Sequence, residues 1–264
     1  MSAIILDGAM VHYEALGRGR PIIFLHSWVG SWRYWINAMQ VASTSFRAYA
    51  IDLYGFGDSS REEKNYTLEE QANLIHKFLE EMGIGKVALV GHDLGALVGF
   101  YFLKNWHASV DRMMAINVPM EYKLIDARMR SDSAAELAAW LTSRSPEAMT
   151  ALSDASKVDP KAVTASMNGL QSENSNLFQG IRNLGVPCLF VHGSTNPAVP
   201  LPTQEKLEEL PGHMHQIVLE GAGHFPMLDN PSQFNRLLTD FLALDSGASP
   251  RELQLKEEWK RRVR

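Results

Sequence analysis

The stretch VALVGHDLGALVGF, residues 87–100, decides the fold that this sequence predicts. It consists of an apolar run, a Gly-His-Asp-Leu-Gly turn at positions 91–95, and a second apolar run with helical spacing. The pattern predicts a buried strand, a tight turn and a helix. A charged residue, Asp93, stands between the two glycines at the end of the buried strand, and this placement needs a physical reason.

The two glycines of the turn, Gly91 and Gly95, indicate positions at which a Cβ atom would collide with neighbouring backbone. Such a turn lifts the side chain of Asp93 above the sheet, at the N-terminus of a helix whose dipole favours an anion. A carboxylate held there can attack an sp³ carbon and form an ester. Aspartate is also a good helix N-cap. The flanking glycines and the strand-turn-helix context favour the nucleophile over the cap.

The composition describes an ordinary globular chain of 264 residues, with 45% hydrophobic and 21% charged residues. The net charge of −5 gives no reason to expect nucleic acid or an anionic membrane as a partner. Cys188 is the single cysteine, so no disulfide forms within the chain. The sequence has no convincing signal peptide and no apolar run of about 18 residues. We therefore expect a cytoplasmic protein.

Strand and helix patterns alternate on both sides of the opening stretch. Strands are predicted as a hairpin within 3–16, at 21–26, at the start of 46–60, and at 86–91, 110–119, 186–193 and 215–221. Helices are predicted at 31–40, 66–83, 94–106, 201–210 and 231–244, the second with a Thr67–Glu70 capping box. This alternation predicts an α/β fold with a mostly parallel sheet and helices on both faces.

The alternation stops in the middle of the chain. Residues 121–185 contain helical patches such as SAAELAAWL and no strand candidate, which predicts a small helical lid insert over one end of the sheet. The core then comprises residues 1–120 and 186–248. Residues 249–264 form a charged C-terminal tail with a basic cluster from Lys260 to Arg262, which we expect to be a solvated helix.

Three segments resemble the α/β-hydrolase superfamily over nearly the full chain. The turn is similar to the G-x-S-x-G nucleophile elbow, with Asp93 in the serine position. FLHSWVGSWRYW (24–35) resembles the loop whose backbone N–H, here of Trp28, joins that of Leu94 in an oxyanion hole. LEGAGHFPMLDNPSQF (219–234) resembles the segment of the catalytic histidine, here His224. The resemblance implies that IDLYGFGDSS (51–60) is structural and that His26, like His92, supports the elbow.

Aspartate at the elbow resembles the epoxide hydrolase and haloalkane or haloacetate dehalogenase branches. AINVPM (115–120) is similar to the Asn-x-Pro of epoxide hydrolases, so Asn117 matches a family asparagine. In these families, aspartate attacks carbon to leave an alkyl ester, and histidine activates the water that hydrolyses it. The resemblance implies a small-molecule substrate and no metal or other cofactor.

The acid of the family's triad is where the chain departs from the pattern. HGSTNPAVP (192–200) resembles G-x-x-D-P-x-x-P, but its fourth position is Asn196. An amide oxygen can accept a hydrogen bond from the ring of His224, but it cannot offset an imidazolium charge. Glu121 and Asp126 are candidate replacements, because both follow the strand predicted at 110–119.

The lid also lacks recognised electrophile-activating groups. Epoxide hydrolases hold the epoxide oxygen with two lid tyrosines, whereas residues 121–185 contain only Tyr122. Many dehalogenases bind halide with a tryptophan after the nucleophile, where this chain has Leu94. Trp140 is a candidate lid donor, with a core position as the alternative. We therefore expect an apolar pocket and a small, largely apolar substrate.

Three functions remain open on the sequence. The first is epoxide hydrolase-like chemistry through an Asp93 ester. The second is hydrolysis of esters or lactones, which a carboxylate nucleophile suits less well because its attack on an acyl group gives an anhydride. The third is a hydrolase-fold protein that binds a ligand with little or no turnover, which Asn196 and the poor lid support.

Overall fold

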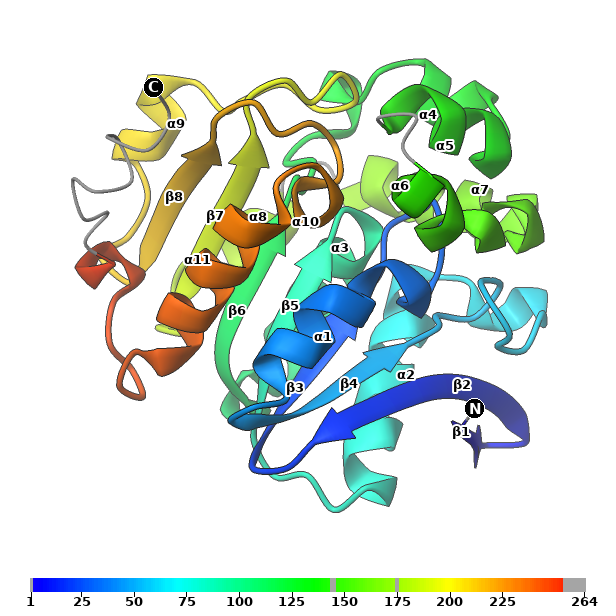
Figure 1. Cartoon of the computed structure of the whole chain (residues 1–264), viewed down its shortest axis with the longest axis horizontal. Coiled ribbons are helices and arrows are strands. Elements are labelled where there is room, and N and C mark those ends of the chain that lie inside the picture. The colour runs from blue at the N-terminus through cyan, green and yellow to red at the C-terminus, as the bar shows by residue number, and fades with distance from the viewer. Residues whose placement is uncertain (1, 143–145, 174–175, 254–264) are drawn as a thin grey trace.

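The computed structural model describes residues 2–142, 146–173 and 176–253. Within these ranges, eight strands form one sheet in the order β1-β2-β4-β3-β5-β6-β7-β8 (Figure 1). The strands are β1 (Ser2–Leu6), β2 (Ala9–Gly17), β3 (Arg20–Leu25), β4 (Phe46–Ile51), β5 (Val87–His92), β6 (Val110–Ile116), β7 (Cys188–Gly193) and β8 (Met214–Leu219). The pairs β1–β2 and β2–β4 are antiparallel, and all other neighbours are parallel.

Helices cover both faces of this sheet, as Figure 1 shows. One layer contains α1 (Ile36–Ala42) and α11 (Pro231–Ala243), which pack together. The other contains α2 (Leu68–Glu81), α3 (Leu94–Trp106) and α8 (Asn176–Ile181). The central strands β3, β5 and β7 are buried along most or all of their length because helices cover both sides. The predicted mostly parallel α/β architecture is confirmed.

Local sequence signals account for several element boundaries. Asp7 and Gly8 have φ values of 48° and 82°, the left-handed conformations that a two-residue hairpin turn requires. The hydroxyl of Thr67 accepts a hydrogen bond from the Glu70 N–H at the start of α2. Gly83, with φ 65°, follows the end of that helix. Of the predicted Thr67–Glu70 capping box, the described hydrogen bonds include only the one to the Thr67 hydroxyl, because the Glu70 carboxylate accepts from the Asn73 side chain instead.

Two predicted helices differ from the structure. The helix predicted at 31–40 is instead a 3₁₀ turn, η1 (Trp32–Trp35), followed by α1. Its tighter first part is fixed by Ser31, whose side chain accepts the Arg33 N–H. The helix predicted at 201–210 is only α9 (Gln204–Glu208). Among the described helices, none has both the length and the apolar character needed to span a bilayer.

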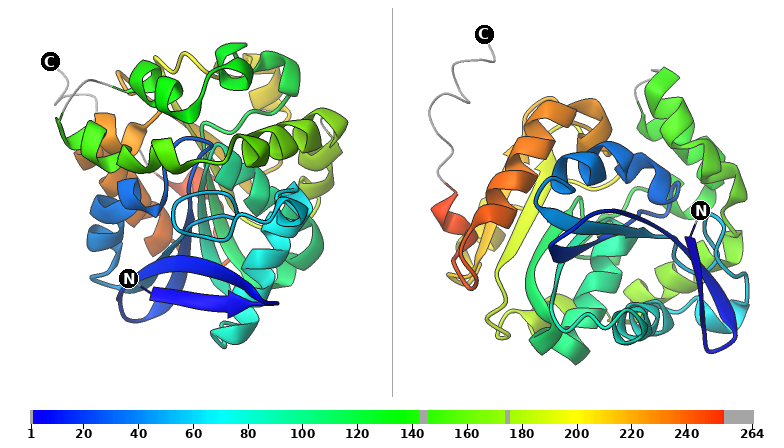
Figure 2. Two further views of the ribbon diagram at one scale, coloured as in Figure 1. Left: turned by 90° about the vertical axis from the view of Figure 1, so that its right-hand side faces the viewer. Right: turned by 60° about the horizontal axis from the view of Figure 1, so that its bottom comes forward.

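Between β6 and β7, every described element of secondary structure is a helix or a 3₁₀ turn, and loops join them. The segment contains α4 (Arg128–Ser131), α5 (Ala134–Leu141), α6 (Pro146–Ala151), the 3₁₀ turn η5 (Ser153–Lys157), α7 (Pro160–Glu173) and α8. Figure 2 shows α4 to α7 lying across one end of the sheet. At the C-terminus, η6 (Pro250–Glu252) ends the described chain. The rest of the predicted tail, including Lys260 to Arg262, lies outside the described residues.

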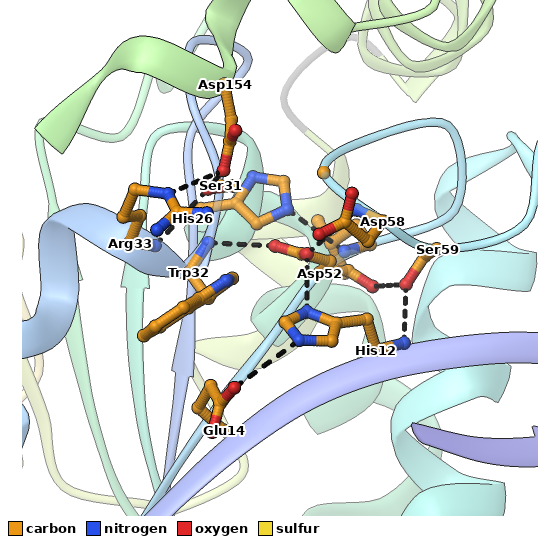
Figure 3. A network of polar contacts seen from close by, with 12 residues as sticks. His12, Glu14, His26, Ser31, Trp32, Arg33, Asp52, Asp58, Ser59 and Asp154 are labelled. Carbon is orange, nitrogen blue, oxygen red and sulfur yellow. Dashed lines mark hydrogen bonds and ion pairs between the residues drawn. The ribbon is translucent and has the colours of Figure 1, made fainter. Parts of the chain in front are cut away.

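A buried carboxylate ties β2, β4 and η1 together (Figure 3). Asp52 is fully buried. Its Oδ1 accepts the Trp32 N–H at 2.8 Å, and its Oδ2 accepts the Asp58 N–H at 3.1 Å. The Nδ1 of His12 lies 2.8 Å from the same Oδ2, and this hydrogen bond raises the pKa of His12. Because several donors satisfy this buried carboxylate, its burial does not carry the free-energy cost of an unpaired charge.

The same group has the composition of a cation site, which the sequence did not predict. Ligand atoms of His12, Asp52 and Asp58 lie within 4.8 Å of one another. However, the His12 Nδ1 and both Asp52 oxygens already have hydrogen-bond partners. The Nδ1 of His12 pairs with Asp52 Oδ2, and the two Asp52 oxygens also accept the N–H groups of Trp32 and Asp58. We therefore assign this cluster to the structural role expected of the 51–60 segment.

Replacing Asp52 with alanine should lower the free energy of unfolding by about 3 to 5 kcal/mol. The change leaves two partly buried N–H groups and the buried ring of His12 without their hydrogen-bond partner. Urea denaturation of D52A against the wild type measures this loss. The matched control is D240A, which removes an exposed carboxylate paired with Arg236 at 3.9 Å and should cost less than about 1 kcal/mol. Equal losses for the two variants would contradict the role given to Asp52.

Candidate active site

The turn after β5 has the strained geometry that its glycines predict. Asp93 has φ 55° and ψ −109°, a conformation that side chains other than glycine rarely adopt. A Cβ on Gly91 would lie 2.5 Å from the carbonyl oxygen of Gly95, and one on Gly95 would lie 2.3 Å from that of Leu25. Glycine is therefore required at both positions, and Asp93 is held at the start of α3.

The structure brings Asp93 and His224 together from distant parts of the sequence. The Nε2 of His224 lies 3.4 Å from the Oδ2 of Asp93, and both side chains are fully buried. This is a contact at the long limit of hydrogen bonding, and neither Asp93 oxygen has a well-aligned hydrogen-bond donor. Burial raises the pKa of Asp93, and the nearby His224 offsets this only in part. The one close polar contact given for this carboxylate among the described residues is therefore the long contact with His224.

Asn196 lies where the sequence places it, beside the other ring nitrogen of His224. Its Oδ1 is 3.1 Å from the Nδ1 of His224 and also accepts the Ala198 N–H at 3.0 Å. With Nδ1 donating its hydrogen to this oxygen, the Nε2 that faces Asp93 carries the lone pair of a base. Asn196 thus orients the imidazole, but its amide supplies no negative charge.

Asn117, which matches the Asn-x-Pro of epoxide hydrolases, is a candidate oxyanion or binding residue from the sequence, but its side chain contacts the histidine loop instead. Its Nδ2 donates to the carbonyl oxygen of His224 at 2.8 Å, and its Oδ1 accepts the Gly193 N–H at 3.0 Å. Because the side chain is fully buried and engaged at both ends, it joins the histidine loop to the end of β7. Asn117 therefore positions His224 and is not a binding residue.

His26 and His92 both pack against the elbow, as expected. The carbonyl oxygen of His26 accepts the Gly95 N–H at 2.9 Å, and its ring Nε2 accepts the Leu53 N–H at 3.0 Å. The Nδ1 of His92 lies 3.1 Å from the hydroxyl of Tyr34, and its ring centroid lies 4.8 Å from that of His224. Burial lowers the pKa of both histidines, so both rings are neutral at neutral pH.

The two N–H groups assigned to the oxyanion hole are unused. Within the described residues, the backbone N–H of neither Trp28 nor Leu94 has a hydrogen-bond acceptor, although both residues are fully buried. Buried N–H groups are almost always paired. Two such donors on the loop after β3 and on the first residue of α3 are therefore suited to an oxygen that carries negative charge during a reaction.

The lid contacts this oxyanion loop through buried polar groups. The indole Nε1 of Trp28 donates to Ser166 of α7 at 2.7 Å. Asp154 of η5 accepts hydrogen bonds from Ser31 at 2.8 Å and from Arg33 at 2.9 Å (Figure 3). The lid is thus attached directly to the residues beside the elbow, which the sequence did not reveal.

The two lid aromatics predicted to contact substrate are placed elsewhere. The ring of Tyr122 lies under Arg130, whose guanidinium is 5.1 Å from the ring centroid. Trp140 is stacked by Arg128 at 4.4 Å and lines an open surface recess on α5. No described hydrogen bond or ring contact joins either residue to Asp93 or His224, so their assignment as binding residues is not supported.

The candidate replacement acids are also committed elsewhere. Glu121 pairs with Lys123 and Lys206. Asp126 is exposed and caps α4 through the Arg128 N–H. The structure brings a different carboxylate close to the histidine loop, because the Oδ2 of Asp229 accepts the Gly223 N–H at 2.9 Å.

The pKa of Asp229 depends on burial and on its neighbours in the histidine loop. Burial raises this pKa, while the Gly223 N–H that donates to its Oδ2 lowers it, and a positive charge on His224 would lower it further. Asp229 follows the histidine by five residues, and nothing in that spacing indicates that its side chain turns back toward it.

The variant D93N should be more stable than the wild type at pH 7, by about 1 to 3 kcal/mol, because it removes a buried and unpartnered charge. The folded-state pKa of Asp93 is raised, so the penalty is fully present above that pKa and disappears as pH falls below the ordinary aspartate value. Urea denaturation at pH 7 and at pH 3.5, which approximates that ordinary value, measures the difference. A D93N protein less stable than the wild type at pH 7 would contradict this account.

Comparison with known proteins agrees with this geometry. A family model described as the alpha/beta hydrolase family matches residues 22–237. A soluble epoxide hydrolase from Corynebacterium sp. is 31% identical over 114 residues, which are 43% of this chain and 40% of that protein. A 2-hydroxy-6-oxo-6-(2'-aminophenyl)hexa-2,4-dienoic acid hydrolase from Metapseudomonas resinovorans is 23% identical over 89% of this chain and 88% of its own length.

Solved structures show the same fold. The epoxide hydrolase CorEH has a TM-score of 0.75 at 21% identity, over 92% of this chain and 98% of its own. An esterase from Thermogutta terrifontis has a TM-score of 0.77 at 19% identity, over 89% and 93% of the two chains. The elbow, the histidine loop and the family match together establish that this chain belongs to the α/β hydrolase family.

Proposed function

We propose that this chain is a hydrolase that opens a strained or activated carbon electrophile through an alkyl ester on Asp93, as an epoxide hydrolase does. The observation that carries the proposal is a buried carboxylate with no well-aligned hydrogen-bond donor, 3.4 Å from the Nε2 of His224 and next to two unused N–H groups. The sequence similarity to a soluble epoxide hydrolase supports it. A small, largely apolar epoxide is the substrate class that fits.

In the first half of the reaction, an oxygen of Asp93 bonds to a ring carbon of the epoxide. The carbon–oxygen bond of the ring breaks, and its electron pair stays on the departing oxygen, which takes a proton from water. The burial of Asp93 strengthens the nucleophile, since a desolvated carboxylate is more reactive than a hydrated one. The ring of Tyr122 packs against Arg130, so we assign Tyr122 no role in activating the epoxide oxygen, and ring strain favours the opening.

In the second half, the Nε2 of His224 takes a proton from water as its oxygen bonds to the Cγ of Asp93. The oxyanion that forms on Asp93 is stabilised by the N–H groups of Trp28 and Leu94. The bond from Cγ to the alkyl oxygen then breaks, and the product alcohol takes the proton from His224. The Asp93 carboxylic acid that remains gives its proton to the hydroxide left from the first half, which restores both the carboxylate and a water molecule. Atoms and charge balance without any further reactant.

This second half requires a positive charge on His224, and here the chain is poorly equipped. Asn196 offers an amide oxygen at 3.1 Å instead of a carboxylate. In serine proteases, which use the same histidine base, exchanging the triad aspartate for asparagine lowers the turnover number by a factor of about 10⁴. A positive charge on His224 would be favoured by the Asp229 carboxylate, whose Oδ2 accepts the N–H of the neighbouring Gly223. We therefore propose that ester formation is faster than ester hydrolysis.

Incubation with styrene oxide should add one equivalent of its mass to the protein, and peptide mapping should locate the adduct on Asp93. The ester should persist, because its formation does not need a charged His224 whereas its hydrolysis does. Intact-mass spectrometry over time measures both steps, with D93N as the control that gains no mass. An adduct that never forms with any epoxide or alkyl halide would favour the ligand-binding alternative.

Replacing Asn196 with aspartate should speed loss of that adduct by roughly 10² to 10⁴. The new carboxylate would lie where the amide now lies, next to the Nδ1 of His224. The matched control is N105D, which adds the same charge to the exposed side of α3 and should leave the rate unchanged. An unchanged rate in N196D would show that charge at this position does not limit hydrolysis.

The second candidate is a protein of this fold that binds a ligand with little or no turnover. It is favoured by one observation, the neutral Asn196 beside His224. The adduct experiment separates the two, because a binder without a reactive Asp93 gains no mass from any electrophile.

A further inference from the structure

A cavity lies away from the elbow, lined by residues of the lid helix α8, helix α9 and strands β7 and β8. Its volume is about 210 Å³. It is lined by apolar side chains and by several polar ones (Met120, Glu121, Phe178, Gln179, Phe190, His192, Pro202, Lys206, Glu209, Leu210 and Gln216). Asp93, His224 and Asn196 are not among the lining residues, so this cavity is distinct from the catalytic pair.

His192 of β7 is the polar group of this cavity that the fold leaves unexplained. Its side chain is only 1% exposed, and its Nε2 is buried without a hydrogen-bond partner among the described residues. Burial lowers its pKa to about 4, so the ring is neutral at neutral pH. A neutral imidazole carries one N–H donor and one acceptor nitrogen, and a buried polar group is normally satisfied.

The walls of the cavity suit a single aromatic ring. Phe178 and Phe190 lie edge to face, with centroids 5.8 Å apart and planes at 71°. Met120 and Leu210 complete the apolar lining. An engineered cavity of about 150 Å³ with apolar walls is known to bind benzene, so about 210 Å³ has room for one ring and a small substituent.

The charged groups at this cavity are already paired. Lys206 forms an ion pair with Glu121. Glu209 lies 3.6 Å from Arg182. A charged ligand would therefore have to displace one of these pairs, whereas a neutral one would not.

We propose that this cavity is a binding site for a neutral monocyclic phenol, whose ring packs against Phe178 and Phe190 and whose hydroxyl hydrogen-bonds to His192. A hydroxyl group fits because it both donates and accepts, so it can satisfy either ring nitrogen. Cavity size limits the ligand to one ring, and the paired charges exclude its ionised forms. This proposal is independent of the reaction assigned to Asp93.

The experiment compares phenol with benzene, which lacks the hydroxyl group, by calorimetric titration of the full-length protein. The wild type should bind phenol at least about tenfold more tightly than benzene. H192F keeps a flat ring but removes both nitrogens, so it should bind phenol only as tightly as benzene and leave benzene binding unchanged. Two results would overturn the proposal. One is equal affinity of the wild type for phenol and benzene, as expected if water alone occupies the polar part of the cavity. The other is unchanged phenol binding in H192F.

A cavity-filling variant covers the case in which H192F does not fold. L210W should abolish binding of both compounds, and its thermal unfolding curve shows whether it is folded. Titration of D93N separates the two sites, because phenol held at His192 should bind this variant with unchanged affinity. Loss of phenol binding in D93N, or full binding in L210W, would place the ligand elsewhere and refute the assignment.

Discussion

The close approach of three backbone segments at the end of β5 is the constraint on which this structure depends. Gly91 packs against the carbonyl oxygen of Gly95, and Gly95 packs against that of Leu25 in β3. This approach holds Asp93 at a positive φ that costs about 1 to 3 kcal/mol by itself. The buried strands β3 and β5 and helix α3 stabilise that strain, and the result is a carboxylate presented to His224.

Two buried carboxylates in this chain have opposite environments. Asp52 accepts bonds from two backbone N–H groups and from His12, and it joins strands and turns. Asp93 is equally buried but has no well-aligned donor. A folded protein keeps an unsatisfied charge of this kind only where a function requires it, since its removal stabilises the fold. The contrast is the strongest physical argument that Asp93 reacts and Asp52 does not.

Two asparagine side chains hold His224 in place, one through its main chain and one through its ring. Asn117 fixes the main chain of His224 by bonds to its carbonyl oxygen and to Gly193, while Asn196 fixes the ring. Both asparagines orient His224, but neither amide carries a negative charge that could stabilise a protonated imidazole. In the proposed reaction the imidazole is therefore oriented, but no carboxylate lies against its Nδ1, where Asn196 lies instead. Orientation and electrostatic compensation, which one carboxylate usually provides together, are separated in this chain.

The sequence by itself determined the parallel sheet and the tight turn around Asp93, because these depend on short-range rules, namely apolar periodicity and glycine at crowded backbone positions. The pairing of Asp93 with His224 and Asn196 was implied only by the resemblance to α/β hydrolases. Only the tertiary structure decided the places of Tyr122, Trp140, Asp229 and His192. Their neighbours come from distant parts of the chain, and side-chain direction within the lid and its cavities depends on packing that no local pattern encodes.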